Sequence, residues 1–508
     1  MPTHDKTGRE KLRWGVYVLL IALAIGNLSG RLLSVNSVDG ARLEAYRIAR
    51  RLKEERVRFE AKGLAGAQLE QQLADRKAQL EEKLKIQRPF LSSNDRSRWL
   101  TVRALVEQGT YEIDALIGLP NWDSIDKVQH RGRDDQLHLY SSKPPLLSTL
   151  VAVPYWCIHR LTGATLGTHP YEIGRFLLLL VNILPLVCMF VLIARLVDQF
   201  GQTDWGRIFV VAVATLGTFL STFATVLNNH IVAAVCATVA LYAVVQIRCA
   251  GKRHLGWFAL AGLMAALTAA TELPALLLLV LLGLYLFIKA PGKTTCGFLP
   301  AVLLVVAAFF ATNYVAHNSW RPPYAHRSAT DPEDNWYQYT YEVNGKQRQS
   351  YWLAPQGIDK GESCRGTYAL HVLVGHHGIF SLTPVWLLSV VGACLWLWRG
   401  PGPTRELAIL VVFLTVICLA FYIGFRPQQD RNYGGMTSGF RWMFWFAPLW
   451  ILVMVPTADE LDKSRIGKAL GLALLALSVV SVSYPTWNPW THPWIYHWLE
   501  YWGWVGLT

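Results

Sequence analysis

Long apolar runs recur along this sequence, and they constrain the fold more than any other feature. Many of these runs have about 17–25 residues, the length of a helix that crosses the hydrocarbon core of a bilayer. Only 16% of the residues are charged, against about 25% in a typical soluble domain. The sequence therefore predicts an all-α polytopic membrane protein with about eleven transmembrane helices. The predicted spans are Trp14–Leu33, Gly174–Ala194, Ile208–Thr225, Ile231–Ile247, Gly256–Ala270, Leu273–Ile288, Phe298–Val315, Ile379–Trp398, Leu407–Phe425, Met443–Pro456 and Leu470–Ser483.

The short loops between the runs indicate how the spans are oriented. Lysine and arginine favour the cytoplasmic side, and the short loops on the same side as the N-terminus are all basic. These loops are Arg248–His254, Lys289–Lys293, Arg399–Arg405 and Lys463–Lys468. The four basic loops lie on the same side as the N-terminus only if Pro144–Leu161 does not cross the membrane. We therefore predict that this run lies in the outer interface or dips into it. A crossing helix is the alternative, and it would invert every later loop.

Three segments outside the predicted bundle have patterns of their own. Residues 40–90 are charged, with apolar residues at heptad-like spacing on both sides of a Lys-Gly break, which predicts a helical hairpin in the outer loop. We interpret it as a solvated stalk, with partner binding as the alternative. Residues 317–378 contain alternating aromatic residues around Asn344-Gly345, a pattern typical of a β-hairpin with a type I′ turn. Residues 486–508 form a Trp-rich tail that we expect at the outer interface.

Polar and ionisable groups gather at the outer ends of these spans. The first outer loop, residues 91–170, supplies the acid Asp95 and the cations Arg98 and Lys143, and a short outer turn supplies Glu272. Ionisable groups at membrane depth are costly and are usually functional. An acid can act as a general base, and arginine and lysine can hold a phosphate leaving group. Because no Walker loop and no GxGxxG motif is present, a lipid-linked donor suits this chain better than a soluble nucleotide sugar.

Short motifs in a fixed order carry a family resemblance. They are Asp95, Trp99-Leu100, Gly109-Thr110-Tyr111, Tyr140-Ser141-Ser142-Lys143-Pro144-Pro145-Leu146, Leu227–His230, Gly378–Pro384 and Gly434–Arg441. In these motifs the chain resembles the GT-C superfamily of integral-membrane glycosyltransferases. That superfamily includes protein O-mannosyltransferases, the aminoarabinose transferase of lipid A and Rgt-like bacterial proteins.

The resemblance implies an inverting hexosyl- or pentosyltransferase that uses a polyprenyl-phosphate sugar at the outer face of the membrane. It also implies that Asp95 is the general base and that Lys143 contacts the donor phosphate. The family often has Asp-Glu where this chain has Asp95-Arg96, so a second acid is missing there. Glu272 is our candidate for that second acid, and Asp39, just after the first span, is a rival base.

These arguments give a set of candidate site residues. Asp95 and Glu272 are the catalytic candidates. The other candidates are Lys143, Arg98, Arg441 and Tyr140 for binding the donor phosphate, and His230, Asn229, His376, His377 and Asp430 for binding substrate. Asp95, Glu272, His230 and His376 could also ligate a divalent cation, Mg²⁺ or Mn²⁺, although no HExxH or DxD motif supports one.

The expected partners are a polyprenyl-phosphate sugar donor and membrane lipids, with no nucleic acid. We expect the protein in a bacterial inner membrane, with its active site facing the periplasm or the outside. A transporter or flippase of lipid-linked sugars is the alternative, and it predicts polar residues deep inside several spans or an internal inverted repeat. The sequence has few such residues and no evident repeat. A scaffold that presents residues 40–90 is a third hypothesis, and it predicts that Asp95→Asn leaves function intact.

Overall fold

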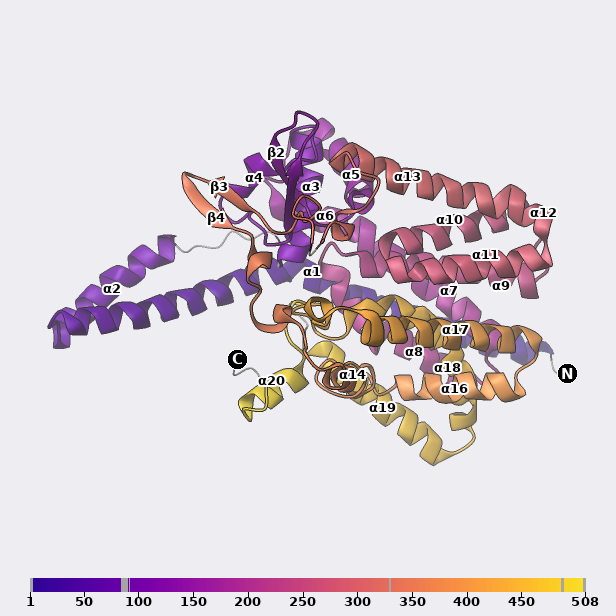
Figure 1. Ribbon diagram of the computed structural model, residues 1–508. Coiled ribbons are helices and arrows are strands. Elements are labelled where there is room, and N and C mark those ends of the chain that lie inside the picture. Colours follow the sequence, from indigo (N-terminus) through magenta and orange to yellow (C-terminus); the bar gives the residue numbers. More distant parts are fainter. Residues whose placement is uncertain (1–2, 84–89, 91, 329, 486–487, 506–508) are drawn as a thin grey trace.

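The computed structural model of the protein describes residues 3–83, 90, 92–328, 330–485 and 488–505. These residues form a helical bundle with a polar cap at one end, from which a long helical hairpin projects (Figure 1). Within the described part, eight helical segments are long and apolar enough to cross a membrane, and three shorter apolar helices accompany them. Each of the eleven predicted spans falls on one of these segments.

The long segments are Gly8–Ser34, Pro170–Phe200, Asp204–Thr225, Asn229–Cys249, Pro291–His317, Gly402–Phe425, Arg441–Asp462 and Arg465–Ser483, and the shorter helices are Leu255–Thr271, Leu273–Lys289 and Trp386–Arg399. One boundary differs clearly from the prediction. The eighth span was expected from Ile379, but a short helix, α15 (Ile379–Leu382), ends before Thr383-Pro384, and the long helix α16 begins at Trp386. A proline disfavours helical backbone at the residue before it, which explains the break.

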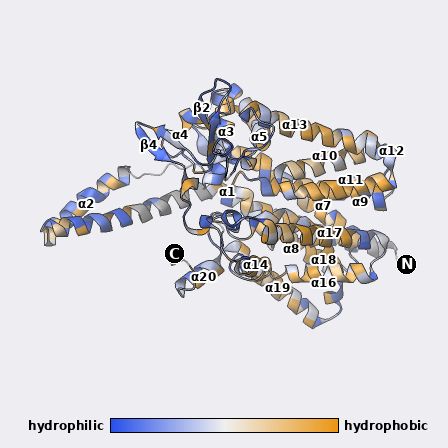
Figure 2. Ribbon diagram, in the orientation of Figure 1, coloured by the Kyte–Doolittle hydropathy of each residue, from blue (hydrophilic) through white to orange (hydrophobic). Residues whose placement is uncertain are grey.

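Hydrophobic residues predominate along the helices of the bundle (Figure 2), and many of their side chains remain exposed on its surface. Leu284, Leu304 and Val480 are each more than half exposed, as expected for side chains that contact lipid. In chain order the bundle consists of α1 (Thr3–Ala61), α6 (Pro170–Leu178), α7 (Leu184–Phe200), α8 (Asp204–Leu216), α9 (Asn229–Cys249), α10 (Leu255–Thr271), α11 (Leu276–Lys289), α13 (Leu299–His317), α16 (Trp386–Arg399), α17 (Gly402–Ala420), α18 (Ala447–Asp462) and α19 (Arg465–Ser483).

The two ends of the bundle have different chemistry. The N-terminus and α12 (Pro291–Lys293), in the basic loop between α11 and α13, lie at the same end (Figure 1). Helix α5 (Pro145–Thr162) lies at the other end, where it packs against α3 (Ser93–Glu107) and α13. It is not among the eight segments that are long and apolar enough to span, and its position in the outer interface stays a prediction.

The predicted helical hairpin is present, but its first helix is not separate from the first span. Helix α1 continues without a break from the membrane segment to Ala61, and α2 (Gly66–Lys83) returns along it. Leu69, Leu73 and Leu80 of α2 are buried, so the heptad-like stripe packs against α1. Residues 84–89 of the predicted insert, residues 40–90, lie outside the described residues.

Two small antiparallel sheets cap the outer end. The hairpin predicted around Asn344-Gly345 is confirmed as β3 (Thr340–Val343) and β4 (Lys346–Gln349). Asn344 and Gly345 have φ of 52° and 71°, the left-handed values that a type I′ turn requires. The second sheet, β1 (Lys127–Arg131) with β2 (Leu137–Ser141), was not predicted. The apolar alternation Val128, Leu137, Leu139 around Gly132 is the signal that could have revealed it.

Candidate active site

A large cavity lies where the bundle meets the outer cap. Its volume is about 1130 Å³. The walls come from the start of α3, the segment before α5, the start of α9, the α10–α11 turn, the second outer loop and the segment between α17 and α18. Seven of the eleven candidate residues line it: Arg98, Lys143, Asn229, His230, Glu272, Asp430 and Arg441. The short outer turns therefore converge, as the sequence predicted.

Three cations, Arg98, Lys143 and Arg441, line this cavity close enough to affect each other's charge. Burial lowers the pKa of Lys143 to about 8, and Arg98 and Arg441 add to the effect while Asp126 opposes it. Burial, reinforced by Arg441, likewise lowers the pKa of Arg98 to about 10. Neighbouring like charges in a partly dehydrated site favour the binding of an anion, which relieves their mutual repulsion. We call these three residues the cation cluster.

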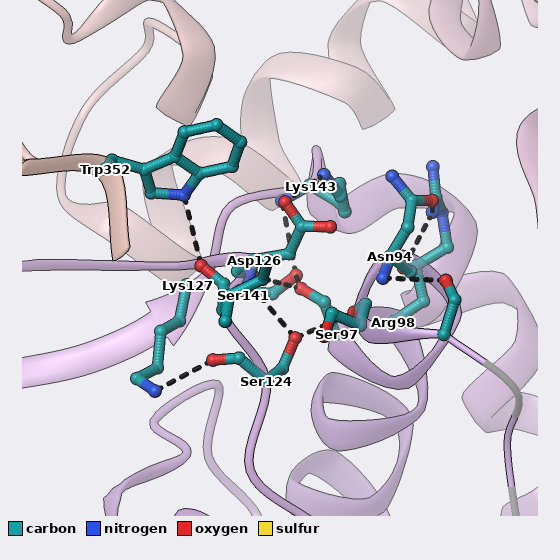
Figure 3. Close-up of polar contacts among 12 residues, drawn as sticks. Asn94, Ser97, Arg98, Ser124, Asp126, Lys127, Ser141, Lys143 and Trp352 are labelled. Carbon is teal, nitrogen blue, oxygen red and sulfur yellow. Dashed lines mark hydrogen bonds and ion pairs between the residues drawn. The ribbon is translucent and has the colours of Figure 1, made fainter. Parts of the chain in front are cut away.

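Lys143 is positioned by an ion pair with a residue that the sequence did not single out. Its Nζ atom lies 3.1 Å from Oδ1 of Asp126 (Figure 3). The backbone of Asp126 is fixed from two sides, because Ser97 Oγ donates to its carbonyl oxygen at 2.5 Å and Ser124 Oγ accepts from its N–H at 3.1 Å. Helix α3 thus holds the loop that carries Asp126.

A hydrogen-bonded chain joins the two arginines of the cation cluster. Arg98 donates to Oδ1 of Asn229 at 2.7 Å, and Nδ2 of Asn229 donates to Oε1 of Glu272 at 2.7 Å. The same carboxylate oxygen contacts Nδ1 of His230, whose Nε2 lies 3.3 Å from a terminal nitrogen of Arg441. Glu272 therefore balances both guanidinium groups through a neutral amide and an imidazole.

Asp95, the predicted base, is not among the residues that line the cavity in the described structure. It is buried, and its Oδ1 accepts hydrogen bonds from Nε1 of Trp99 and from the backbone N–H of Leu227. Burial raises the pKa of Asp95 to about 7, partly offset by the Leu227 hydrogen bond. Successive helical residues point about 100° apart, so the cavity is lined by the preceding residue, Asn94, instead. Here Asp95 fastens α3 to the segment that precedes α9.

Tyr140 also lies outside the cavity lining. Its ring stacks on His130 with centroids 4.2 Å apart, and His130 stacks on Trp336 at 4.1 Å. The stack joins the β1–β2 hairpin to the second outer loop, so Tyr140 supports the cap and does not reach the cation cluster.

His376 and His377 are the remaining candidates that do not line the cavity. The His377 ring stacks on Tyr433, with centroids 4.9 Å apart, and His376 stacks on His371 at 3.9 Å. Tyr433 belongs to the turn that precedes Arg441, so these histidines pack behind the cavity wall.

The four residues considered as metal ligands are not brought together. Glu272 and His230 are in contact, but Asp95 is bonded to Trp99 and His376 stacks on His371. Among the described residues, no group of three or more His, Cys, Asp or Glu side chains is arranged to hold a metal ion. The side chain of Asp39, the rival base, lies outside the described part.

Three cavity carboxylates were missed by sequence reasoning, Asp123, Asp126 and Asp359. All three lie in long polar loops where many charged residues occur, so no local pattern distinguishes them. Asp430, which was predicted, also lines the cavity and forms ion pairs with Arg327 at 3.2 Å and Arg426 at 3.4 Å.

A bundle of membrane-spanning helices with a charged cavity at one end defines a polytopic integral membrane protein of the GT-C type. The chain belongs to glycosyltransferase family 87, whose sequence profile matches residues 158–421, more than half of its 508 residues. The predicted GT-C membership and the glycosyltransferase class are therefore confirmed.

Solved structures of an oligosaccharyltransferase from Archaeoglobus fulgidus are similar to this chain at a low level. The complex with Zn and sulfate has 13% identity and a TM-score of 0.41, covering 78% of this chain and 50% of that one. The apo form and the complex of AglB with an inhibitory peptide and a dolichol-phosphate each have 12% identity and a TM-score of 0.40, covering 82% and 54%. This chain spans about half the length of those proteins. No curated protein matches it.

Proposed function

We propose that this glycosyltransferase moves a sugar from a polyprenyl-phosphate donor to an acceptor at the outer face of a bacterial inner membrane. The observation that carries the proposal is one cavity that combines the cation cluster with an apolar wall whose residues are partly exposed on the bundle surface. The donor phosphate would bind the cation cluster, and the prenyl chain would lie against the apolar wall.

The cation cluster supports the phosphate-binding part of the proposal. Lys143 is a point charge with donors beyond its contact to Asp126, and Arg98 and Arg441 approach from other walls of the same cavity. When the bond between the anomeric carbon and the phosphate oxygen breaks, the phosphate keeps the electron pair and gains negative charge. Preorganised cations stabilise that charge without further reorganisation. Stabilising the phosphate in this way requires no contact with a nucleotide base or a ribose.

The apolar wall supports the lipid-linked part of the proposal. Four apolar residues line the cavity: Leu273 on the α10–α11 turn, Leu277 in the first turn of α11, Ile417 in the last turn of α17 and Phe421 directly after α17. Leu273, Ile417 and Phe421 are also at least 42% exposed on the bundle surface. In a membrane that surface contacts acyl chains, so a prenyl chain can lie in the bilayer while its phosphate reaches the cations. A soluble nucleotide sugar has no prenyl chain to place against such a wall.

The proposed side of the membrane follows from charge. The basic loops and the N-terminus share one end of the bundle, and the cavity lies at the other end with the β-hairpins and α5 (Figure 1). Because lysine and arginine in short loops favour the cytoplasm, the cavity opens on the outer side, which is the periplasm in a bacterium with two membranes. Inverting transfer of a hexose or pentose remains part of this proposal.

Binding of a lipid phosphate tests the proposal directly. Full-length protein in lipid nanodiscs is titrated with farnesyl phosphate and with farnesol, which has the same chain without the charge. We expect farnesyl phosphate to bind and farnesol to bind at least tenfold more weakly. Lys143→Met removes one charge-assisted contact, worth about 1.5–3 kcal/mol, and should weaken farnesyl phosphate by about 10–100-fold.

Lys346→Met is the matched control, because Lys346 is an exposed lysine on β4 that does not line the cavity. Equal affinity for farnesyl phosphate and farnesol, or unchanged affinity in Lys143→Met, would contradict the proposal.

A further inference from the structure

Asp359 differs from the other acids of the cavity. It lies in a short 3₁₀ turn, Gly357–Lys360, of the second outer loop. Four of the five cavity carboxylates have a basic partner within 4 Å: Asp123 with Lys127, Asp126 with Lys143, Glu272 with His230, and Asp430 with Arg327. Within the described structure, Asp359 is the fifth and forms no ion pair of this kind. It is therefore the cavity acid whose charge is least committed to holding the fold.

Two neutral groups orient the Asp359 carboxylate. Asn432 donates its side-chain N–H to Oδ1 at 3.0 Å, and the Tyr351 hydroxyl lies 3.0 Å from Oδ2. Burial raises the pKa of Asp359, partly offset by the Tyr351 contact. A carboxylate held in fixed geometry with a raised pKa is a stronger base than an ordinary carboxylate and is suited to accept a proton.

One tight turn connects Asp359 to the cation cluster. Tyr433, Gly434 and Gly435 have consecutive positive φ values of 60°, 99° and 81°. Left-handed backbone is costly for a tyrosine and is retained where the surroundings fix it. Asn432, at the start of the turn, contacts Asp359, and the carbonyl oxygen of Gly434 accepts from Nε of Arg441 at 2.7 Å. The turn thus fixes the carboxylate relative to the guanidinium that would hold the phosphate.

The surroundings of Asp359 suit a hydroxylated ligand. Tyr351 and Trp352 line the cavity beside it, with ring centroids 5.3 Å apart. The Trp352 indole is held by a hydrogen bond from Nε1 to the carbonyl oxygen of Ile125 at 3.1 Å (Figure 3). Aromatic faces next to amide and carboxylate groups complement a sugar ring, which has apolar faces and polar hydroxyl groups at its edges.

We propose that Asp359 is the general base that activates the acceptor, an inference that rests on the proposed function. Tyr351, Trp352 and Asn432 form its subsite for a carbohydrate hydroxyl. In the step, the acceptor O–H gives its proton to a carboxylate oxygen of Asp359 as the acceptor oxygen bonds to the anomeric carbon. The bond from that carbon to the phosphate oxygen breaks, and the electron pair leaves with the lipid phosphate. Asp359 then releases the proton to water.

The test uses the full-length protein in nanodiscs, with farnesyl-phosphate hexoses labelled in the sugar as donors and methyl hexosides as acceptors. Transfer and donor hydrolysis are measured for wild type, Asp359→Asn and Asp359→Glu. We expect Asp359→Asn to lower turnover at least 100-fold, the range of general-base catalysis, with farnesyl phosphate affinity within twofold of wild type. Asp359→Glu should recover part of the turnover. Tyr351→Phe, which removes one hydrogen bond, should lower turnover three- to tenfold and shift the acidic limb of the pH profile upward.

Glu342→Gln is the matched control, because Glu342 is an exposed acid on β3 of the same loop, outside the cavity. It should leave turnover unchanged. Asp359→Asn with more than a third of wild-type turnover, or with lost farnesyl phosphate affinity, would overturn the inference while the proposed function stands. Wild type that binds no farnesyl phosphate would overturn the proposed function, and with it the donor chemistry on which the inference rests.

Discussion

Asp95 accepts a hydrogen bond on Oδ1 from Nε1 of Trp99, one helical turn later on α3, at 3.0 Å. The backbone N–H of Leu227 donates to the same oxygen at 2.8 Å. Both donors are buried, so the acid closes the contact between α3 and the segment leading into α9. An acid used in this way serves the architecture of the site without reaching the cavity.

Asp95→Asn should therefore preserve the fold and most of the activity. An amide oxygen can accept both hydrogen bonds, whereas Asp95→Ala leaves two buried donors unpaired and should lower the Tm markedly. Because the pKa of Asp95 is raised to about 7 in the folded state, against about 3.9 when unfolded, wild-type stability falls as pH rises from about 4 through 7. Asp95→Asn has no carboxyl group to ionise at this position, so its stability does not fall for this reason as pH rises. Thermal unfolding at pH 5 and pH 8 should show a Tm advantage for Asp95→Asn of about 2–4 °C at pH 8.

If Asp95 is the base after all, Asp95→Asn will lose at least 100-fold in turnover at every pH, with the Tm unchanged. Turnover and Tm measured on the same preparation separate the two roles.

Affinity for a lipid phosphate should depend on pH through Lys143. Its pKa in the folded protein is lowered to about 8, so its charge is present below pH 8 and is lost as pH rises above it. Wild-type affinity for farnesyl phosphate should fall by about tenfold between pH 7 and pH 9. In Lys143→Arg the charge persists over this range, so the affinity should stay flat. An equal fall in both proteins would rule out Lys143 as the titrating group.

Gly361→Ala should displace Asp359. Gly361 has φ of +77°, and a Cβ there would collide with the carbonyl oxygen of Gln428. The 3₁₀ turn that carries Asp359 must then move, because backbone strain and a backbone clash act together. We expect turnover to fall at least tenfold while farnesyl phosphate affinity is kept. Gly345→Ala is the control, since Gly345 has φ of +71° with nothing within 4 Å.

The helical hairpin should be separable from donor binding. Leu73 of α2 is buried at 8% exposure, and replacing it with glutamate places a charge against α1. Leu73→Glu should release α2, seen as faster proteolytic cleavage within Gly66–Lys83, without changing farnesyl phosphate affinity. A parallel loss of affinity would show that the hairpin takes part in the site.

Much of the fold could be predicted because the bilayer imposes a strong local rule. A run such as Asn229–Cys249 must be a helix, since its backbone groups have no water to pair with. The Asn-Gly pair at 344–345 likewise specifies its turn, because few other residues adopt left-handed backbone. The motif order and the polar groups at outer turns then identified seven cavity residues, among them Lys143, Glu272 and Arg441.

Only the tertiary structure decided which side chains face the cavity. Asn94 and Asp95 are adjacent in sequence, yet one lines the cavity and the other is buried against Trp99. That outcome depends on the rotation of α3 against the segment before α9, which no local pattern encodes. Asp359 reaches the site through a turn more than seventy residues later in the chain, and long polar loops have no period from which such a contact could be read.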